Sequence, residues 1–266
     1  MSNSVPGEDA AGASGGVQSV DRAVTVLEIL ARRGSAGVSE VAADIGVHKS
    51  TAFRLLGALE HRGLVQQAGD RGKYQLGFGL LRLAGAIPGG LDVVRQAGPT
   101  LEELATAFGE TVNLAVLRSH YAVNLTQARG PAAVSAQNWT GELTPLHATS
   151  SGKILLAHQN RARQQSLIDE AGLTRYTEHT ITSREQFQRQ LDAAVVDGYA
   201  TTFEEYEIGL NAIAAPVFDH DATIAASVSV SGPTFRLDRP RMGAIRTELI
   251  AASQRISARL GYVEPK

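Results

Sequence analysis

The sequence predicts an α+β protein built from a small helical domain and a larger sheet domain. Apolar residues recur at helical spacing from residue 17 to about residue 63, in consecutive short segments. Two strand-like segments around the turn "GDRG" follow directly. Beyond Gly109, alternating apolar segments are mixed with helical ones, which is typical of an antiparallel sheet packed against helices. A chain of 266 residues is long enough for two such domains.

The helical segments of the smaller domain have recognisable ends. The first helix is expected to end at Gly34, after a basic last turn. Ser39 is expected to cap a short second helix, which Gly46 ends in a tight turn. Ser50 is expected to cap a third helix. The apolar face of that helix follows the spacing i, i+3, i+4, i+7 and consists of Ala52, Leu55, Leu56 and Leu59.

The hairpin completes a predicted winged helix-turn-helix over residues 17–78. Residues 1–16 are small, polar and glycine-rich, so a disordered tail is expected there. Residues 79–96 are predicted to form a linker helix, and residues 97–266 are predicted to form the sheet domain. Within that domain the predicted strand pairs are "TVNLAVLR" with "YAVNLTQ" and "LNAIAAPVFD" with "ATIAASVSVSG".

Composition excludes several classes of protein. The sequence contains no cysteine, which excludes a disulfide framework and thiolate chemistry and fits a reducing compartment. The N-terminus lacks the apolar core of a secretory signal, and no apolar run approaches the roughly 18 residues of a membrane span. We therefore expect a cytoplasmic protein. The net charge is -2, but a neutral neighbouring domain can mask a small basic surface in that total.

The front of the third helix carries the strongest functional signal. Basic and hydroxyl side chains gather there, on or near the face opposite the apolar stripe. A helix N-terminus attracts phosphate, and an arginine one turn further in can reach a guanine edge in the major groove. Arg71 and Lys73 at the hairpin tip are placed like a wing against a sugar-phosphate backbone. The predicted DNA-binding residues are Ser39, His48, Lys49, Ser50, Thr51, Phe53, Arg54, Arg71 and Lys73.

Two alternatives stay open within this set. Lys49 and Arg54 can form an ordinary solvated helix face, which is the usual position of helical charges. The adjoining helix–glycine turn–helix and the basic hairpin tip favour DNA binding instead. Phe53 can contact a sugar or a thymine methyl group, or it can pack on the hairpin.

Several segments resemble the IclR family of bacterial transcriptional regulators over about residues 17–260. In the first domain they are "VQSVDRAVTVLEILA", "GVSEVAADIGVHKSTAFRLLGALEHRGLV" and "KYQLG". In the second they are "TVNLAVL", "PLHATSSGKILLA", "DGYATTFEEYEIGLNAIAAPVFD" and "ASVSVSGP". The resemblance implies a GAF-like effector-binding domain, a double-stranded DNA operator, an organic acid effector, a homodimer formed through the DNA-binding half, and often a homotetramer.

The resemblance also implies which residues bind the effector. The hydroxyls of Ser229 and Ser231 are expected to contact a small ligand, together with the backbone amides of Ser150 and Ser151 before a helix. Thr202 stands where an acidic residue is common, and Ala212 where cysteine is common, among family members that bind small oxo-acids. Both changes remove polarity and favour a more apolar or aromatic carboxylate.

Other candidate sites are weaker. Trp139 can line the cavity or simply pack, and packing is favoured. Glu204 and Glu205 are expected to lie in a solvated loop away from the ligand. H-E-x-x-H does not occur, and no G-x-S-x-G nucleophile elbow between a strand and a helix appears, so we expect no enzyme activity, catalytic residues, metal or cofactor. The alternative function is a small-molecule sensor or enzyme whose N-terminal domain only mediates association.

Overall fold

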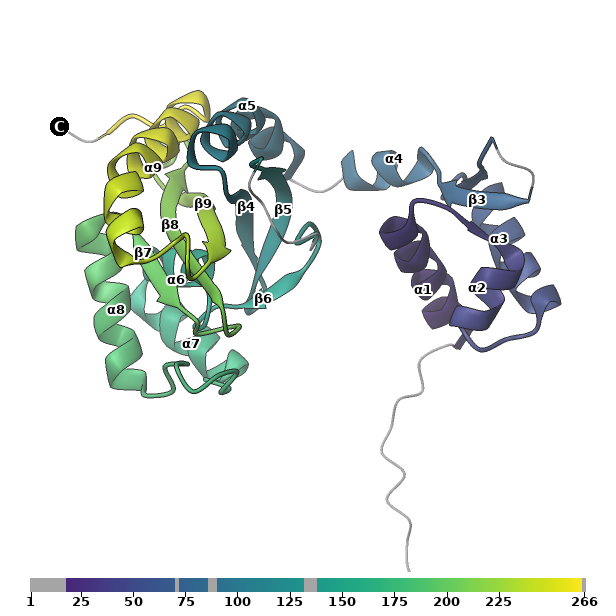
Figure 1. Cartoon of the computed structure of the whole chain (residues 1–266), viewed down its shortest axis with the longest axis horizontal. Helices are drawn as coiled ribbons and strands as arrows, with labels where there is room; N and C mark the ends of the chain where they lie inside the picture. Colours follow the sequence, from purple (N-terminus) through teal and green to yellow (C-terminus); the bar gives the residue numbers. More distant parts are fainter. Residues whose placement is uncertain (1–17, 70–71, 86–89, 132–137, 265–266) are drawn as a thin grey trace, which may run out of the picture. The chain divides into compact units, whose positions relative to one another are not determined.

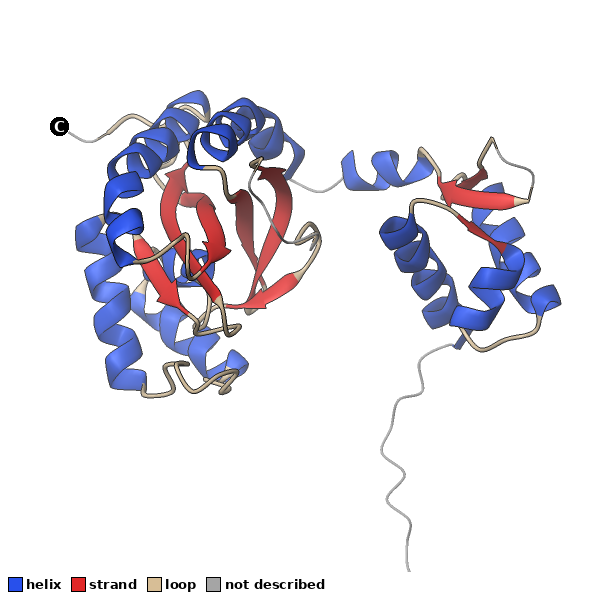
Figure 2. Ribbon diagram, viewed as in Figure 1, coloured by secondary structure: helices blue, strands red, loops and turns tan. Residues whose placement is uncertain are grey.

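The chain folds into two units, which divide between Pro88 and Gly89. The structure, a computed structural model, describes residues 18–69, 72–85, 90–131 and 138–264 (Figures 1 and 2). The predicted tail, residues 1–16, lies outside the described residues. No helix in the described ranges is long and apolar enough to cross a membrane.

The smaller unit combines helices with a three-stranded antiparallel sheet in the order β1-β3-β2. One apolar core holds it together, and Val26, Leu30 and Leu56 are fully buried in that core. The predicted hairpin is confirmed as β2 and β3, and β1 adds a short strand beside β3. The elements are α1 (Gln18–Arg33), β1 (Ala36–Gly37), α2 (Val38–Asp44), α3 (Lys49–His61), β2 (Val65–Gln67), β3 (Lys73–Leu76) and α4 (Gly79–Gly85).

The turn between α2 and α3 has the geometry of a helix-turn-helix. Gly46 adopts a φ of 65°, a left-handed conformation that favours glycine, and Val47 N–H donates to the carbonyl of Ala42 at 3.0 Å. Both predicted caps are wrong by two residues. The cap of α2 is Gly37 rather than Ser39, because the carboxylate of Glu40 accepts a hydrogen bond from the Gly37 amide at 2.7 Å.

The helix α3 begins two residues earlier than its predicted cap implies. Its cap is His48 rather than Ser50, and the His48 side chain makes no capping hydrogen bond. The apolar face is otherwise as predicted, because Ala52, Leu56 and Leu59 are buried and Leu55 is half-buried. The buried apolar face holds the helix in place, while its first turn has no side-chain cap.

The larger unit is a six-stranded antiparallel sheet with helices on both faces (Figure 2). The strand order is β6-β5-β4-β9-β8-β7, and both predicted strand pairs are confirmed, as β4 with β5 and β8 with β9. The elements are α5 (Gly90–Phe108), β4 (Thr111–Arg118), β5 (Tyr121–Arg129), β6 (Leu143–Pro145), α6 (Ser150–Ala157), α7 (Arg161–Ala171), α8 (Arg184–Asp197), β7 (Ala200–Phe203), β8 (Leu210–Phe218), β9 (Ile224–Pro233) and α9 (Arg239–Arg259).

The two faces of the sheet have different partners because side chains alternate along each strand. On β9, Val228 and Val230 join the core that α5 and α9 cover. Ser227, Ser229 and Ser231 therefore point to the opposite face, where α6 and α8 contribute a second core. Residues 79–96, predicted as one linker helix, correspond to α4 and the start of α5, with residues 86–89 outside the described ranges.

Candidate functional sites

The front of α3 presents a group of exposed polar side chains. His48, Lys49, Ser50 and Arg54 are exposed, and Thr51 is half-buried. Neither Lys49 nor Arg54 forms an ion pair with any residue in the described part of the chain. The first backbone amides of a helix lack intrahelical acceptors, so this end combines positive partial charge with two exposed cationic side chains.

The other predicted DNA-binding residues lie on α3, β3 and α2, except for one outside the described ranges. Phe53 is 59% exposed, so the interpretation in which it packs on the hairpin is not supported. Lys73 is exposed at the start of β3, and Ser39 is exposed inside α2. Arg71 lies outside the described residues.

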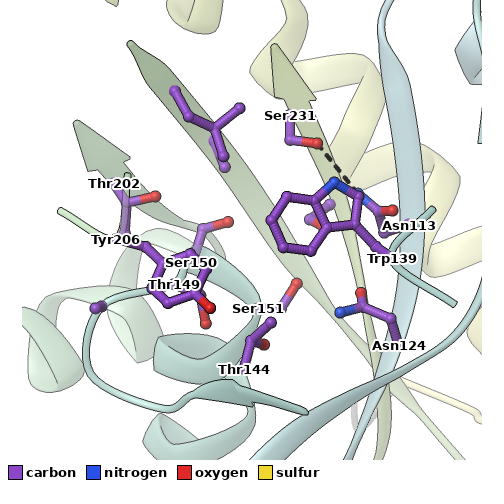
Figure 3. A pocket seen from close by; sticks show the side chains of 14 residues that line it. Asn113, Asn124, Trp139, Thr144, Thr149, Ser150, Ser151, Thr202, Tyr206 and Ser231 are labelled. Atoms are coloured by element: carbon purple, nitrogen blue, oxygen red, sulfur yellow. Dashed lines mark hydrogen bonds between the residues drawn. The ribbon is translucent and has the colours of Figure 1, made fainter. Parts of the chain in front are cut away.

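The second site is a pocket of about 60 Å³ on the α6 face of the large sheet (Figure 3). Adjacent strands supply one wall, because the register aligns residues that share this face. Ser231 pairs with Ala212, and Ala212 with Thr202, across β9, β8 and β7. On the other side Ser229 pairs with Asn113 of β4. The pocket thus brings together the six residues predicted to bind the effector, which are Ser150, Ser151, Thr202, Ala212, Ser229 and Ser231.

The N-terminus of α6 forms the facing wall. Thr149 caps the helix, since its hydroxyl accepts from the Gly152 amide at 3.2 Å and donates to the carbonyl of Pro145 at 2.8 Å. Ser150 and Ser151 follow, both buried and both lining the pocket. Gly152 allows this close approach, because a Cβ there would lie 2.5 Å from the Cα and carbonyl oxygen of Leu146.

Several lining residues were not among those predicted to bind the effector. Trp139, for which packing was favoured over lining the cavity, lines the pocket beside Tyr206, with ring centroids 6.3 Å apart. Burial raises the pKa of Tyr206, so its phenol stays neutral and can donate a hydrogen bond. Asn113 and Asn124 contribute carboxamides from β4 and β5 (Figure 3). The pairing register of the strands places both carboxamides at the pocket. Only a correct alignment of these strands could have identified the two residues from the sequence.

The expectation that Glu204 and Glu205 form a solvated loop is wrong for Glu205, which is 5% exposed. Lys153, from the second turn of α6 and 1% exposed, donates to both of its carboxylate oxygens at 2.7 Å. Burial lowers the pKa of Lys153 and raises that of Glu205, while their mutual attraction opposes both shifts. Neither residue lines the pocket, but the pair fixes the loop that carries Tyr206 to the helix that carries Ser150 and Ser151.

Comparison with known proteins identifies the family. Residues 19–69 match the model of the IclR helix-turn-helix domain, and residues 87–258 match that of the Bacterial transcriptional regulator IclR C-terminal domain. The chain belongs to the IclR family. The α+β architecture, with N-terminal helix-turn-helix and C-terminal antiparallel sheet, is accordingly that of IclR regulators, and the predicted family and fold class are confirmed.

Curated relatives in the IclR family cover nearly the whole chain. The HTH-type transcriptional repressor AllR of Klebsiella pneumoniae is 34% identical over 258 residues, which is 96% of this chain and 94% of that protein. The HTH-type transcriptional regulator XynR of Escherichia coli (strain K12) is 31% identical over 247 residues, which is 92% of this chain and 98% of that protein. Both relatives are named as transcriptional regulators.

Two solved IclR structures are similar throughout. The Thermotoga maritima IclR has a TM-score of 0.77 and 26% identity, covering 93% of this chain and 100% of its own. An IclR homologue from Microbacterium hydrocarbonoxydans, solved in complex with 4-hydroxybenzoate, has a TM-score of 0.69 and 27% identity, covering 90% of this chain and 99% of its own.

Proposed function

We propose that this IclR-family regulator binds a double-stranded operator through the front of α3 and the β2–β3 wing. The observation that carries the proposal is the exposed, cationic and side-chain-uncapped N-terminus of α3. Lys49 is placed to neutralise a phosphate, and Arg54 to reach a base edge. The wing contributes Lys73 and, by its sequence position, Arg71.

The DNA-binding unit acts as a homodimer in this proposal. Two copies of a recognition helix can occupy successive major grooves of a near-palindromic operator. The smaller unit has apolar side chains exposed on α1 and around α4 that a second copy would cover. They are Val20, Val24, Phe78, Leu81 and Leu83. Two such dimers can also associate into a homotetramer. A measurement of the molecular mass in solution distinguishes the dimer from the tetramer.

We propose that the pocket of the larger unit binds a small organic carboxylate that modulates operator affinity. The amides at the start of α6 suit a carboxylate, and the hydroxyls of Ser229 and Ser231 supply further hydrogen bonds. Thr202 and Ala212 add no charge, and the rings of Trp139 and Tyr206 favour an aromatic acid. The bound 4-hydroxybenzoate of the Microbacterium hydrocarbonoxydans homologue supports the same class of ligand.

The proposal excludes catalysis and assigns the protein to the cytoplasm, where its operator would be accessible. The alternative is a sensor or enzyme in which the smaller unit only mediates association. An acidic or apolar front on α3 would favour that alternative, and the exposed Lys49 and Arg54 oppose it.

Binding to the DNA that flanks the coding region of this protein tests the function. We expect a gel shift at low salt, and we expect benzoate or a substituted benzoate to change the operator affinity. By linkage, an acid that weakens operator binding must itself bind less tightly to the DNA-bound protein. If folded protein gives no shift at low salt, the alternative function is correct.

A further inference from the structure

The polar wall of the pocket contains a buried acceptor without a donor. Asn113 is 5% exposed, and its Nδ2 donates to the hydroxyl of Ser231 at 3.2 Å (Figure 3). Its Oδ1 has no hydrogen-bond partner among the described residues. Buried carboxamide oxygens are nearly always paired, so an unpaired one that lines a cavity indicates a missing donor.

A second carboxamide lies on the same wall. Asn124 of β5 is opposite Ala115, immediately beyond an irregularity in the β4–β5 register at Leu114/Ala115. Its backbone N–H and carbonyl pair with Glu142 and Gly141, while its side chain makes no hydrogen bond within the described ranges. The side chain lines the pocket and is therefore available to a ligand.

The pocket is also uncharged. None of the 14 residues seen to line it in Figure 3 is an Asp, Glu, Lys, Arg or His. The N-terminus of α6, beside Ser150, supplies positive potential that suits a single carboxylate. A second anionic group would be buried without a counter-ion. The rest of the ligand must therefore form its hydrogen bonds with Asn113 and Asn124 through neutral groups.

We infer that Asn113, assisted by Asn124, selects effectors that carry a neutral hydrogen-bond donor, such as a hydroxyl, in addition to one carboxylate. In Figure 3, Asn113 and Asn124 lie on the opposite side of the pocket from Ser150 and Thr202. A ligand that spans the pocket presents its carboxylate to α6 and its hydroxyl to the Oδ1 of Asn113. Trp139 and Tyr206 contact the ring between these groups. This inference rests on the proposed effector-binding function and specifies its ligand.

Matched aromatic acids test the inference on the wild-type protein. The probes are 3- and 4-hydroxybenzoate, each compared with the fluorobenzoate of the same substitution, because fluorine approximates the size of a hydroxyl and cannot donate. We expect calorimetry to give a dissociation constant at least about tenfold lower for one hydroxybenzoate than for its fluoro counterpart. Equal affinities, or no binding by either hydroxybenzoate, would overturn the inference.

Substitutions assign the selectivity to Asn113. In Asn113→Leu the preference for the hydroxyl over fluorine should fall to within about threefold. Asn113→Ala serves the same purpose if the leucine variant does not fold. Ser227→Ala is the matched control, because Ser227 is a buried residue on the same face of β9 that does not line the pocket. Full preference retained in both Asn113 variants would contradict the role of this side chain.

A measurement of operator binding distinguishes a failure of the inference about the ligand from a failure of the proposed function. Failure of the wild-type protein to bind DNA would refute the proposed function, whereas failure to prefer the hydroxyl would refute only the inference about the ligand.

Discussion

The ammonium of Lys153 lies 2.7 Å from both carboxylate oxygens of Glu205, and it also donates to the carbonyl of Thr201 at 3.2 Å. The hydroxyls of Thr177 and Thr180 donate to the carbonyls of Glu204 and Glu205, each at 2.6 Å. This buried network connects α6 to the loop between β7 and β8, two elements that both line the pocket. Its integrity should determine how rigidly the pocket is held.

Removal of one member of this pair should be strongly destabilising. Lys153→Met leaves the Glu205 carboxylate buried without its partner, and we expect a loss of about 3–5 kcal/mol in the free energy of unfolding. Urea denaturation followed by the fluorescence of Trp139, the only tryptophan, reports on the larger unit. The control is Arg189→Met, which breaks the exposed Arg189–Glu185 pair and should cost no more than about 0.5 kcal/mol. Similar losses in the two variants would contradict this account.

The close contact at Gly152 predicts a different response in two glycine variants. Gly152→Ala places a methyl group against the backbone of Leu146, so the start of α6 must move and effector affinity should be lost. Gly243→Ala, inside α9 and with nothing within 4 Å of the added Cβ, should increase stability by about 0.5–1 kcal/mol. Calorimetric titration with hydroxybenzoates and urea denaturation measure both effects. Unchanged ligand affinity in Gly152→Ala would show that the N-terminus of α6 is not part of the binding site.

Two histidines predict a loss of stability in acid. Burial lowers the pKa of His147 and of His158 below the ordinary value of 6.5, and the charge of Lys153 acts in the same direction on His147. As the pH falls below about 6.5, these histidines take up protons in the unfolded state before they do so in the folded state, and the free energy of unfolding decreases. The double variant His147→Gln/His158→Gln should therefore show a weaker decline between about pH 7 and pH 5 in urea denaturation. An equally steep decline in this variant would refute the assignment.

The proposed dimer predicts that an added charge near α4 dissociates it. In Leu81→Glu a carboxylate would be buried at the interface, so the molecular mass in sedimentation should fall to that of one chain and operator affinity should decrease. Val263→Glu, at another exposed apolar residue, is the control and should alter neither property. A dimer that persists in Leu81→Glu would place the interface elsewhere.

The sequence predicted the wall formed by β8 and β9 because strand alternation is a local property. The serines at residues 227, 229 and 231 necessarily share a face once the strand is recognised. The register that brings Asn113 beside Ser229 depends on pairing between distant strands, and the sequence contains no local signal for it. For this reason Asn113 and Asn124 were found only in the structure.

The other differences between the predictions from the sequence and the structure also arise because the sequence carries no local signal for them. Glu205 has the composition of a solvated loop residue, and its burial depends on Lys153, which is 52 residues away. Trp139 packs beside Tyr206, which lies in another loop. In α7 the apolar stripe is weak, with only Gln164, Leu167 and Ile168 buried, so this helix was not singled out from the sequence. Helix caps were misplaced by two residues, as is usual for helix ends.

The salt dependence of operator affinity in Lys49→Ala and Arg54→Ala tests the central claim most directly, because both side chains are exposed at the front of α3 and are not needed for its core. We expect Lys49→Ala to weaken binding and to reduce the slope of log affinity against log salt by about one. We expect Arg54→Ala to lose about 1–3 kcal/mol in operator discrimination. Arg189→Ala, in the larger unit, should match the wild type. Wild-type affinity and slope in both α3 variants would contradict the account.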